Sequence, residues 1–103
     1  MKKSNATVIA IFLGLAGAAA PAAAEPPVGR LLASQCFQCH GTNGRSTSNI
    51  ESIEGKNANK LYEKLLEMKA DPERTVMNQQ AKVYDDTELR KIADYLATLP
   101  SAK

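Results

Sequence analysis

Both cysteines and the only histidine of this 103-residue chain lie within five consecutive positions, in the segment SQCFQCHGTNGRS at residues 34–46. Cys36 and Cys39 are three positions apart, and His40 follows directly. Thiol and imidazole chemistry in this chain is therefore concentrated at one point. Any covalently bound group or metal that uses these side chains is expected there.

Four kinds of site can use such a segment. A disulfide between Cys36 and Cys39 closes a very small loop, which constrains the unfolded chain little, and it leaves His40 without a role. A thioredoxin-like redox pair needs a βαβ context, which the sequence lacks. A zinc site needs four ligands, and the chain has only three strong ones. Covalent attachment of haem has Cys-x-x-Cys-His as its signature and is the interpretation we favour.

The spacing suits that chemistry. Two thiols three positions apart on a helical turn can each form a thioether with one of the two vinyl groups of a single haem. We therefore predict one covalently bound haem c, with Cys36 and Cys39 as the attachment residues and His40 as the proximal axial ligand of the iron. Apolar residues expected to cover the haem are Leu32, Ile50, Ile53, Leu61 and Leu65.

The second axial ligand cannot be another histidine of this chain, because His40 is the only one. Two methionines follow residue 24. Met68 is in phase with the leucines of an amphipathic helix and suits a core position, whereas Met77 follows the break at Asp71-Pro72, where a loop can point a thioether at the iron. We predict Met77 as the distal ligand, with Met68 as the alternative. A His/Met pair raises the reduction potential and leaves no vacant position for a substrate, which predicts one-electron transfer and no catalysis by this chain itself.

The elements that must position these residues are all helical by pattern. Helical spacing of apolar residues predicts helices over 28–39 and 58–70. A last helix is predicted from a cap at Asp85 or Asp86, with Glu88 near its third position, to about Leu99. The residues of this helix expected to face inward are Leu89, Ile92, Ala93, Leu96 and Leu99.

Between these helices, residues 41–49 have the composition of a loop, and residues 73–84 show no sustained period. The latter stretch is expected to be mostly irregular, with room for one helical turn. No window alternates as a strand should over a useful length. The predicted fold class is all-α, with three to four short helices around one covalently bound haem.

Residues 1–24 have the layout of a secretory signal peptide, with Lys2 and Lys3, an apolar run, and Ala22 and Ala24 in a small-x-small pattern. Cleavage is predicted between Ala24 and Glu25, which exports the remaining chain to the periplasm. The apolar run of about 15 residues is shorter than the ~20 needed to span a bilayer, so no membrane span is expected in the mature protein. An uncleaved segment would instead tether the domain at the outer face of the inner membrane.

The mature chain is predicted to be a single domain, residues 25–103. The whole chain has 13 basic and 11 acidic residues, and removal of Lys2 and Lys3 leaves 11 of each. The two signs are interleaved, which argues against a nucleic-acid partner. A domain this small has a thin apolar core, and a large bound group such as haem would complete it.

Three features together resemble the class I c-type cytochromes. They are CFQCHG after a short helix, a downstream Met77, and the last helix DTELRKIADYLATL. The resemblance covers nearly the whole mature chain and implies the class I cytochrome c fold. It also implies that the first and last helices cross closely, with Gly29 and Tyr95 as the candidate contact.

A narrower resemblance covers GTNGRS, IESIEG and the stretch from Leu61 to Pro100. These segments are similar to the cytochrome subunit of flavocytochrome c sulfide dehydrogenase, here in a version with one haem motif. The resemblance implies a separate FAD-containing flavoprotein subunit that oxidises sulfide, while this chain passes single electrons to a periplasmic acceptor. Residues expected at the partner-facing edge are Arg45, Gln79, Gln80 and Lys82.

Two other functions stay open. One is a freely diffusing monohaem carrier between a periplasmic dehydrogenase or bc-type complex and a terminal oxidase or reductase. The other is a ligand-binding or catalytic haem protein in which Met77 is displaced from the iron.

Overall fold

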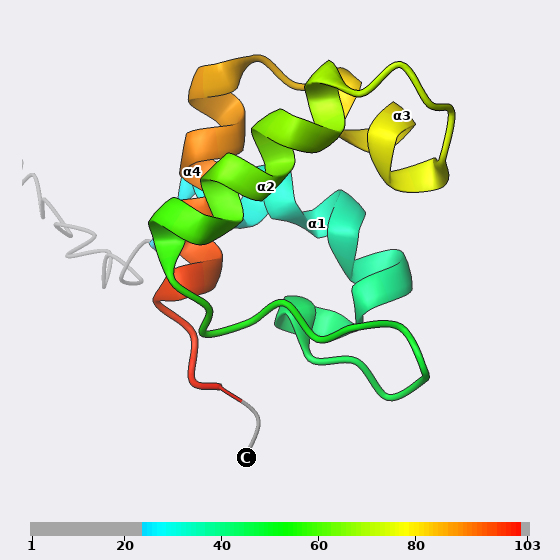
Figure 1. Ribbon diagram of the computed structural model, residues 1–103. Coiled ribbons are helices and arrows are strands. Elements are labelled where there is room, and N and C mark those ends of the chain that lie inside the picture. Colours follow the sequence, from blue (N-terminus) through cyan, green and yellow to red (C-terminus); the bar gives the residue numbers. More distant parts are fainter. Residues whose placement is uncertain (1–23, 102–103) are drawn as a thin grey trace, which may run out of the picture.

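The computed structural model describes residues 24–101, which contain four α-helices and one 3-10 turn. Their order is α1 (Val28–His40), η1 (Thr42–Gly44), α2 (Ala58–Ala70), α3 (Val76–Lys82) and α4 (Asp86–Ala97) (Figure 1). No strand occurs between residues 24 and 101, so the predicted all-α fold is confirmed. The predicted signal peptide lies outside the described residues, apart from Ala24. Within the described range, no helix has both the length and the apolar character needed to cross a membrane.

Side-chain caps begin the last three helices. Asp85 accepts a 2.7 Å hydrogen bond from the Glu88 backbone N–H, and the Glu88 carboxylate accepts one of 3.0 Å from the Asp85 N–H. This is the reciprocal capping box that the sequence predicts. Asn57 and Thr75 cap α2 and α3 in the simpler way, each accepting from the backbone N–H three residues later.

The helix boundaries agree with the sequence prediction except at two ends. Helix α1 runs one residue further than predicted, to His40. Helix α4 stops at Ala97, before the predicted limit of about Leu99. The N–H groups of Thr98 and Leu99 instead bond to the carbonyls three residues earlier, which tightens the last turn.

The prediction for residues 73–84 was wrong in part. This stretch contains the seven-residue helix α3, which is more than the single turn expected. A helix this short shows too few apolar repeats to be detected by period. It forms because Thr75 caps it and because it packs against α2.

Helix α4 supplies the centre of the domain. Its buried residues are Leu89, Ile92, Ala93 and Leu96, as the inward stripe predicts, while Leu99 is only half-buried. Helices α1 and α2 each pack on α4, and α3 packs on α2. The buried Tyr84 ties the segment after α3 to α1, because its hydroxyl donates a 3.0 Å hydrogen bond to the Leu32 carbonyl.

Helix α1 crosses α4 at Gly29, and the two backbones approach closely there. A Cβ placed on Gly29 would lie 2.8 Å from the Cβ of Tyr95 and even closer to the Lys91 carbonyl oxygen. Only a residue without a side chain permits this approach. The expected contact between Gly29 and Tyr95 is thus confirmed.

We predict that Gly29→Ala lowers the free energy of unfolding by about 1–3 kcal/mol through overpacking at this crossing. Alanine is otherwise the better helix former by roughly 1 kcal/mol, so the sign of the change separates the two effects. Denaturant unfolding of the haem-loaded protein measures it. Ser34→Ala, an exposed change on the same helix, is the control, and a Gly29→Ala protein as stable as wild type would contradict the close packing.

Candidate haem site

The C-terminal part of α1 carries Cys36, Cys39 and His40. Cys36 is half-buried, Cys39 is exposed, and both thiols are free. The helix ends because Gly41 adopts a φ of 84°, a conformation that favours glycine, and its N–H bonds to the Phe37 carbonyl. His40 is therefore placed at the point where the chain turns away from α1.

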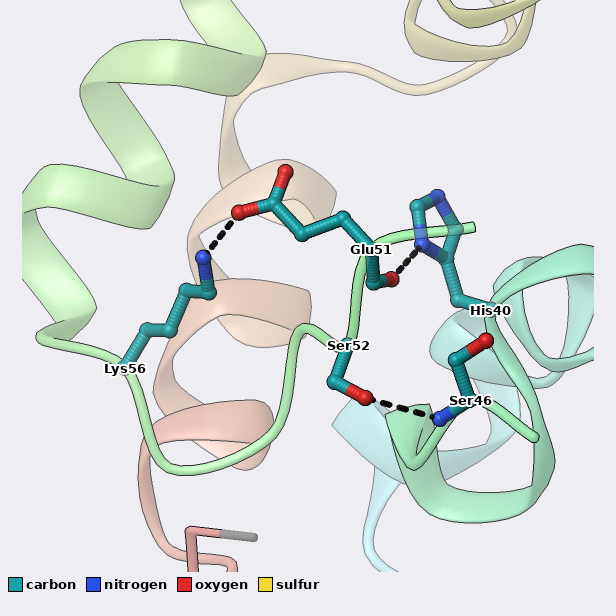
Figure 2. A network of polar contacts seen from close by, with 5 residues as sticks. All are labelled: His40, Ser46, Glu51, Ser52 and Lys56. Carbon is teal, nitrogen blue, oxygen red and sulfur yellow. Dashed lines mark hydrogen bonds and ion pairs between the residues drawn. The ribbon is translucent and has the colours of Figure 1, made fainter. Parts of the chain in front are cut away.

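The imidazole of His40 is held by one hydrogen bond. Its Nδ1 lies 2.6 Å from the backbone carbonyl oxygen of Glu51 (Figure 2). A carbonyl oxygen can only accept, so Nδ1 must carry the proton and donate it. The neutral ring then has its free lone pair on Nε2, the state in which a histidine binds a metal.

Two contacts hold the loop that carries Glu51. The Ser46 backbone N–H donates a 2.9 Å hydrogen bond to the Ser52 hydroxyl. The Lys56 ammonium forms an ion pair with the Glu51 carboxylate (Figure 2). The acceptor for His40 is thus a fixed part of the fold.

All four predicted site residues line one cavity of about 660 Å³, which is within the usual size range of cofactor pockets. Cys36, Cys39 and His40 reach it from α1, and Met77 reaches it from α3. Its leucine and isoleucine lining residues are Ile53, Leu61, Leu65, Ile92 and Leu96.

Helix α3 is held so that Met77, near its start, borders the cavity. The buried Asn78 donates a 3.1 Å hydrogen bond from its amide to the Glu73 carbonyl. At the other end, the Lys82 ammonium donates a 2.6 Å hydrogen bond to the Asp71 carbonyl. Met68 of α2 also lines the cavity, so two thioethers are available there.

Only some of the residues predicted to cover the haem line the cavity. Ile53, Leu61 and Leu65 line the cavity, whereas Leu32 packs against the buried core and Ile50 is 40% exposed. Sequence reasoning did not assign Ile92 and Leu96 to the cavity. They belong to the predicted inward stripe of α4, but a stripe does not tell which of its residues face a cavity and which face neighbouring helices.

The expected partner-facing residues are also separated. Gln80 lines the cavity, but Arg45 does not. The Arg45 guanidinium lies 3.6 Å from the buried carboxylate of Glu54.

The surroundings of Cys36 favour an uncharged sulfur, because burial raises the pKa of the Cys36 thiol. A thioether sulfur has no ionised form and loses nothing by burial. Across residues 24–101, no three His, Cys, Asp or Glu side chains are grouped so as to hold a metal ion by themselves.

The cavity thus combines two thiols, an imidazole with its Nε2 lone pair free, two thioethers and an apolar lining. This donor set fits a haem that is covalently attached and axially ligated. Residues 28–100 match the protein family described as Cytochrome c. The chain belongs to the cytochrome c family.

A curated relative agrees with this assignment. The cytochrome subunit of sulfide dehydrogenase from Chlorobaculum tepidum is 38% identical over 87 residues, which cover 81% of this chain and 79% of the relative. Membership of the cytochrome c family implies covalently bound haem c. It makes this chain an electron carrier that is not an enzyme by itself.

The ion pair between Glu51 and Lys56 leads to a prediction about pH. Hydrogen bonding to Lys56, together with its positive charge, lowers the pKa of the Glu51 carboxyl. A lowered pKa gives stability that is present above the unfolded-state value of about 4.3 and is lost as the pH falls through the folded-state value. We expect Glu51→Gln to melt slightly below wild type at about pH 6 and equally at about pH 3, since exposed ion pairs contribute little.

Thermal unfolding of the haem-loaded proteins across this range measures the difference. Glu63→Gln is the matched control, because Glu63 is exposed on α2 and forms no ion pair with any residue of the described part of the chain. A deficit of Glu51→Gln that grows as the pH falls would refute the assignment.

Proposed function

We propose that this cytochrome c is exported to the periplasm and accepts single electrons from an FAD-containing subunit that oxidises sulfide. It then passes them to a periplasmic acceptor. The observation that carries the proposal is the similarity to a sulfide dehydrogenase cytochrome subunit over most of both chains. The lining of one cavity by Cys36, Cys39, His40 and Met77 supports it. The mature protein would be residues 25–103.

Within the site, we assign Cys36 and Cys39 to thioether attachment, His40 to the proximal side of the iron and Met77 to the distal side. The haem, when bound, supplies a one-electron couple between ferric and ferrous iron. The Nε2 lone pair of His40 is available because the Glu51 carbonyl holds the opposite nitrogen. Met77 comes from a separate helix, so the two ligands are positioned independently.

The remaining residues favour electron transfer over catalysis. Leucine and isoleucine side chains from α2 and α4 line the cavity and offer an apolar surface to the haem. If His40 and Met77 both bind the iron, no position on it would be left for a substrate. Ligands held by fixed elements need to move little when the charge of the iron changes, which favours rapid electron exchange.

The lip of the cavity near α1 and α3 suits contact with a partner subunit. Gln35, Val76 and Gln80 line it and carry no charge, and Val76 is 79% exposed. A neutral lip can be covered by a flavoprotein with little cost from removing charged groups from water. Arg45, which lies elsewhere, is not needed for this contact.

Substitution of the two methionines tests the distal ligand. Met77→Ala should abolish the sulfur-to-ferric-iron charge-transfer band in the red, lower the midpoint potential and allow the ferrous protein to bind carbon monoxide. Met68→Ala is the matched control and should keep the band. Absorption spectra at neutral pH measure both, and loss of the band in Met68→Ala alone would transfer the distal role to Met68.

Purification of the native chain from the periplasmic fraction of its own organism tests the function. We expect a polypeptide carrying FAD to co-purify with it, and sulfide to reduce the haem only when that polypeptide is present. N-terminal sequencing should begin at Glu25. Isolation solely as a flavin-free monomer that exchanges electrons with several partners would favour the freely diffusing carrier instead.

A further inference from the structure

The charged residues that line the haem cavity are confined to one segment. They are Lys56, Lys60 and Lys64, with Glu51 as the single acidic member, and all lie between residues 51 and 64. Three positive charges against one negative charge leave a net charge of +2. The remaining lining side chains are apolar or uncharged, apart from the imidazole of His40.

These lysines lie on a different side of the cavity from the two cysteines. Helices α1 and α2 both pack on α4, and no comparable packing joins α1 to α2 in the described part of the chain. The cysteines come from α1, whereas Lys60 and Lys64 come from α2 and Lys56 from the loop before it. Figure 2 shows Lys56 and His40 on opposite sides of Glu51.

The chemistry of haem gives this asymmetry a meaning. Its two vinyl groups occupy one edge of the macrocycle, and its two propionate carboxylates occupy the opposite edge. The following step rests on the attachment at Cys36 and Cys39 proposed above. If the vinyl edge is bonded to α1, the carboxylates are directed away from α1, toward the side that carries the lysines.

We propose that Lys56, Lys60 and Lys64 form the carboxylate subsite of the haem cavity and bind the two propionates. Two carboxylates beside an apolar cavity need cationic partners, because an unpaired charge that is removed from water is costly. The net charge of +2 on the charged lining residues balances them. Lysine also suits the position, since its methylene stem can lie on apolar lining while its ammonium group reaches the rim.

Lys60 is the principal member of the subsite. Lys56 is already paired with Glu51, and the Lys64 ammonium lies 3.7 Å from the carboxylate of Glu67. Lys60 has no ion pair with any residue in the 24–101 range, so its charge is available to a carboxylate. Glu63 on the same helix does not line the cavity.

Zero-length cross-linking tests the contact directly. A water-soluble carbodiimide activates a propionate, and attack by a lysine amine in contact forms an amide, while the carbodiimide takes up one water to become a urea. We expect the haem-loaded chain to lose the mass of one water for each link. Peptide mapping should show the haem peptide of Cys36 and Cys39 joined at Lys60, with lesser links at Lys56 or Lys64.

Redox titration gives a second, independent readout. Lys60→Gln should raise by about one pH unit, a tenfold change in proton affinity, the pH at which the midpoint potential responds to propionate ionisation. Lys60→Arg should form no link at residue 60 but keep the wild-type titration, since the charge is retained. The control is Lys91→Gln, because Lys91 is also exposed and without an ion pair in the described part of the chain, but it does not line the cavity.

The outcomes separate this subsite from the proposed attachment. Haem found on Cys36 and Cys39 but linked to lysines outside residues 56–64, or to none, would overturn the subsite and leave the proposed function standing. The same holds if Lys60→Gln titrates as Lys91→Gln does. An intact mass without haem would overturn both.

Discussion

The hydrogen bond from His40 Nδ1 to the Glu51 carbonyl is the contact on which the site depends. It joins the end of α1 to the loop before α2, and it decides which imidazole nitrogen is free to bind iron. Because the acceptor is a backbone group, its position is set by the loop conformation and not by the identity of residue 51. The bonds made by Ser46, Ser52 and Lys56 therefore act on His40, the proposed iron ligand, although none of them reaches it.

The domain is built around its cavity as much as around its core. The apolar stripe of α4 serves both. Leu89, Ile92, Ala93 and Leu96 are all buried, and Ile92 and Leu96 also border the cavity. A chain of this size has little apolar surface to bury, so a bound haem adds a large share of the contacts that hold α1, α2 and α3 in place. Folding and cofactor binding are thus coupled in the same residues.

The cavity is also divided by charge. Uncharged Gln35, Val76 and Gln80 border it near α1 and α3, while every charged lining residue lies between 51 and 64. A planar group with one apolar edge and one anionic edge fits this division in only one orientation. Because no charged residue of α1 or α3 lines the cavity, a partner can approach it on that side without displacing strongly hydrated groups.

Local chemistry allowed much of this protein to be predicted from its sequence. Cys36, Cys39 and His40 are adjacent in the chain, the capping box at Asp85 and Glu88 is a local pattern, and the stripe of α4 follows from helical periodicity. Each of these depends on residues a few positions apart. What the tertiary structure decided depends on distant segments: the Glu51 acceptor for His40, the helix that carries Met77, the absence of Leu32 and Ile50 from the cavity lining, and the presence of three lysines in it. Those features arise from packing between elements far apart in the chain, and periodicity and spacing carry no information about such packing.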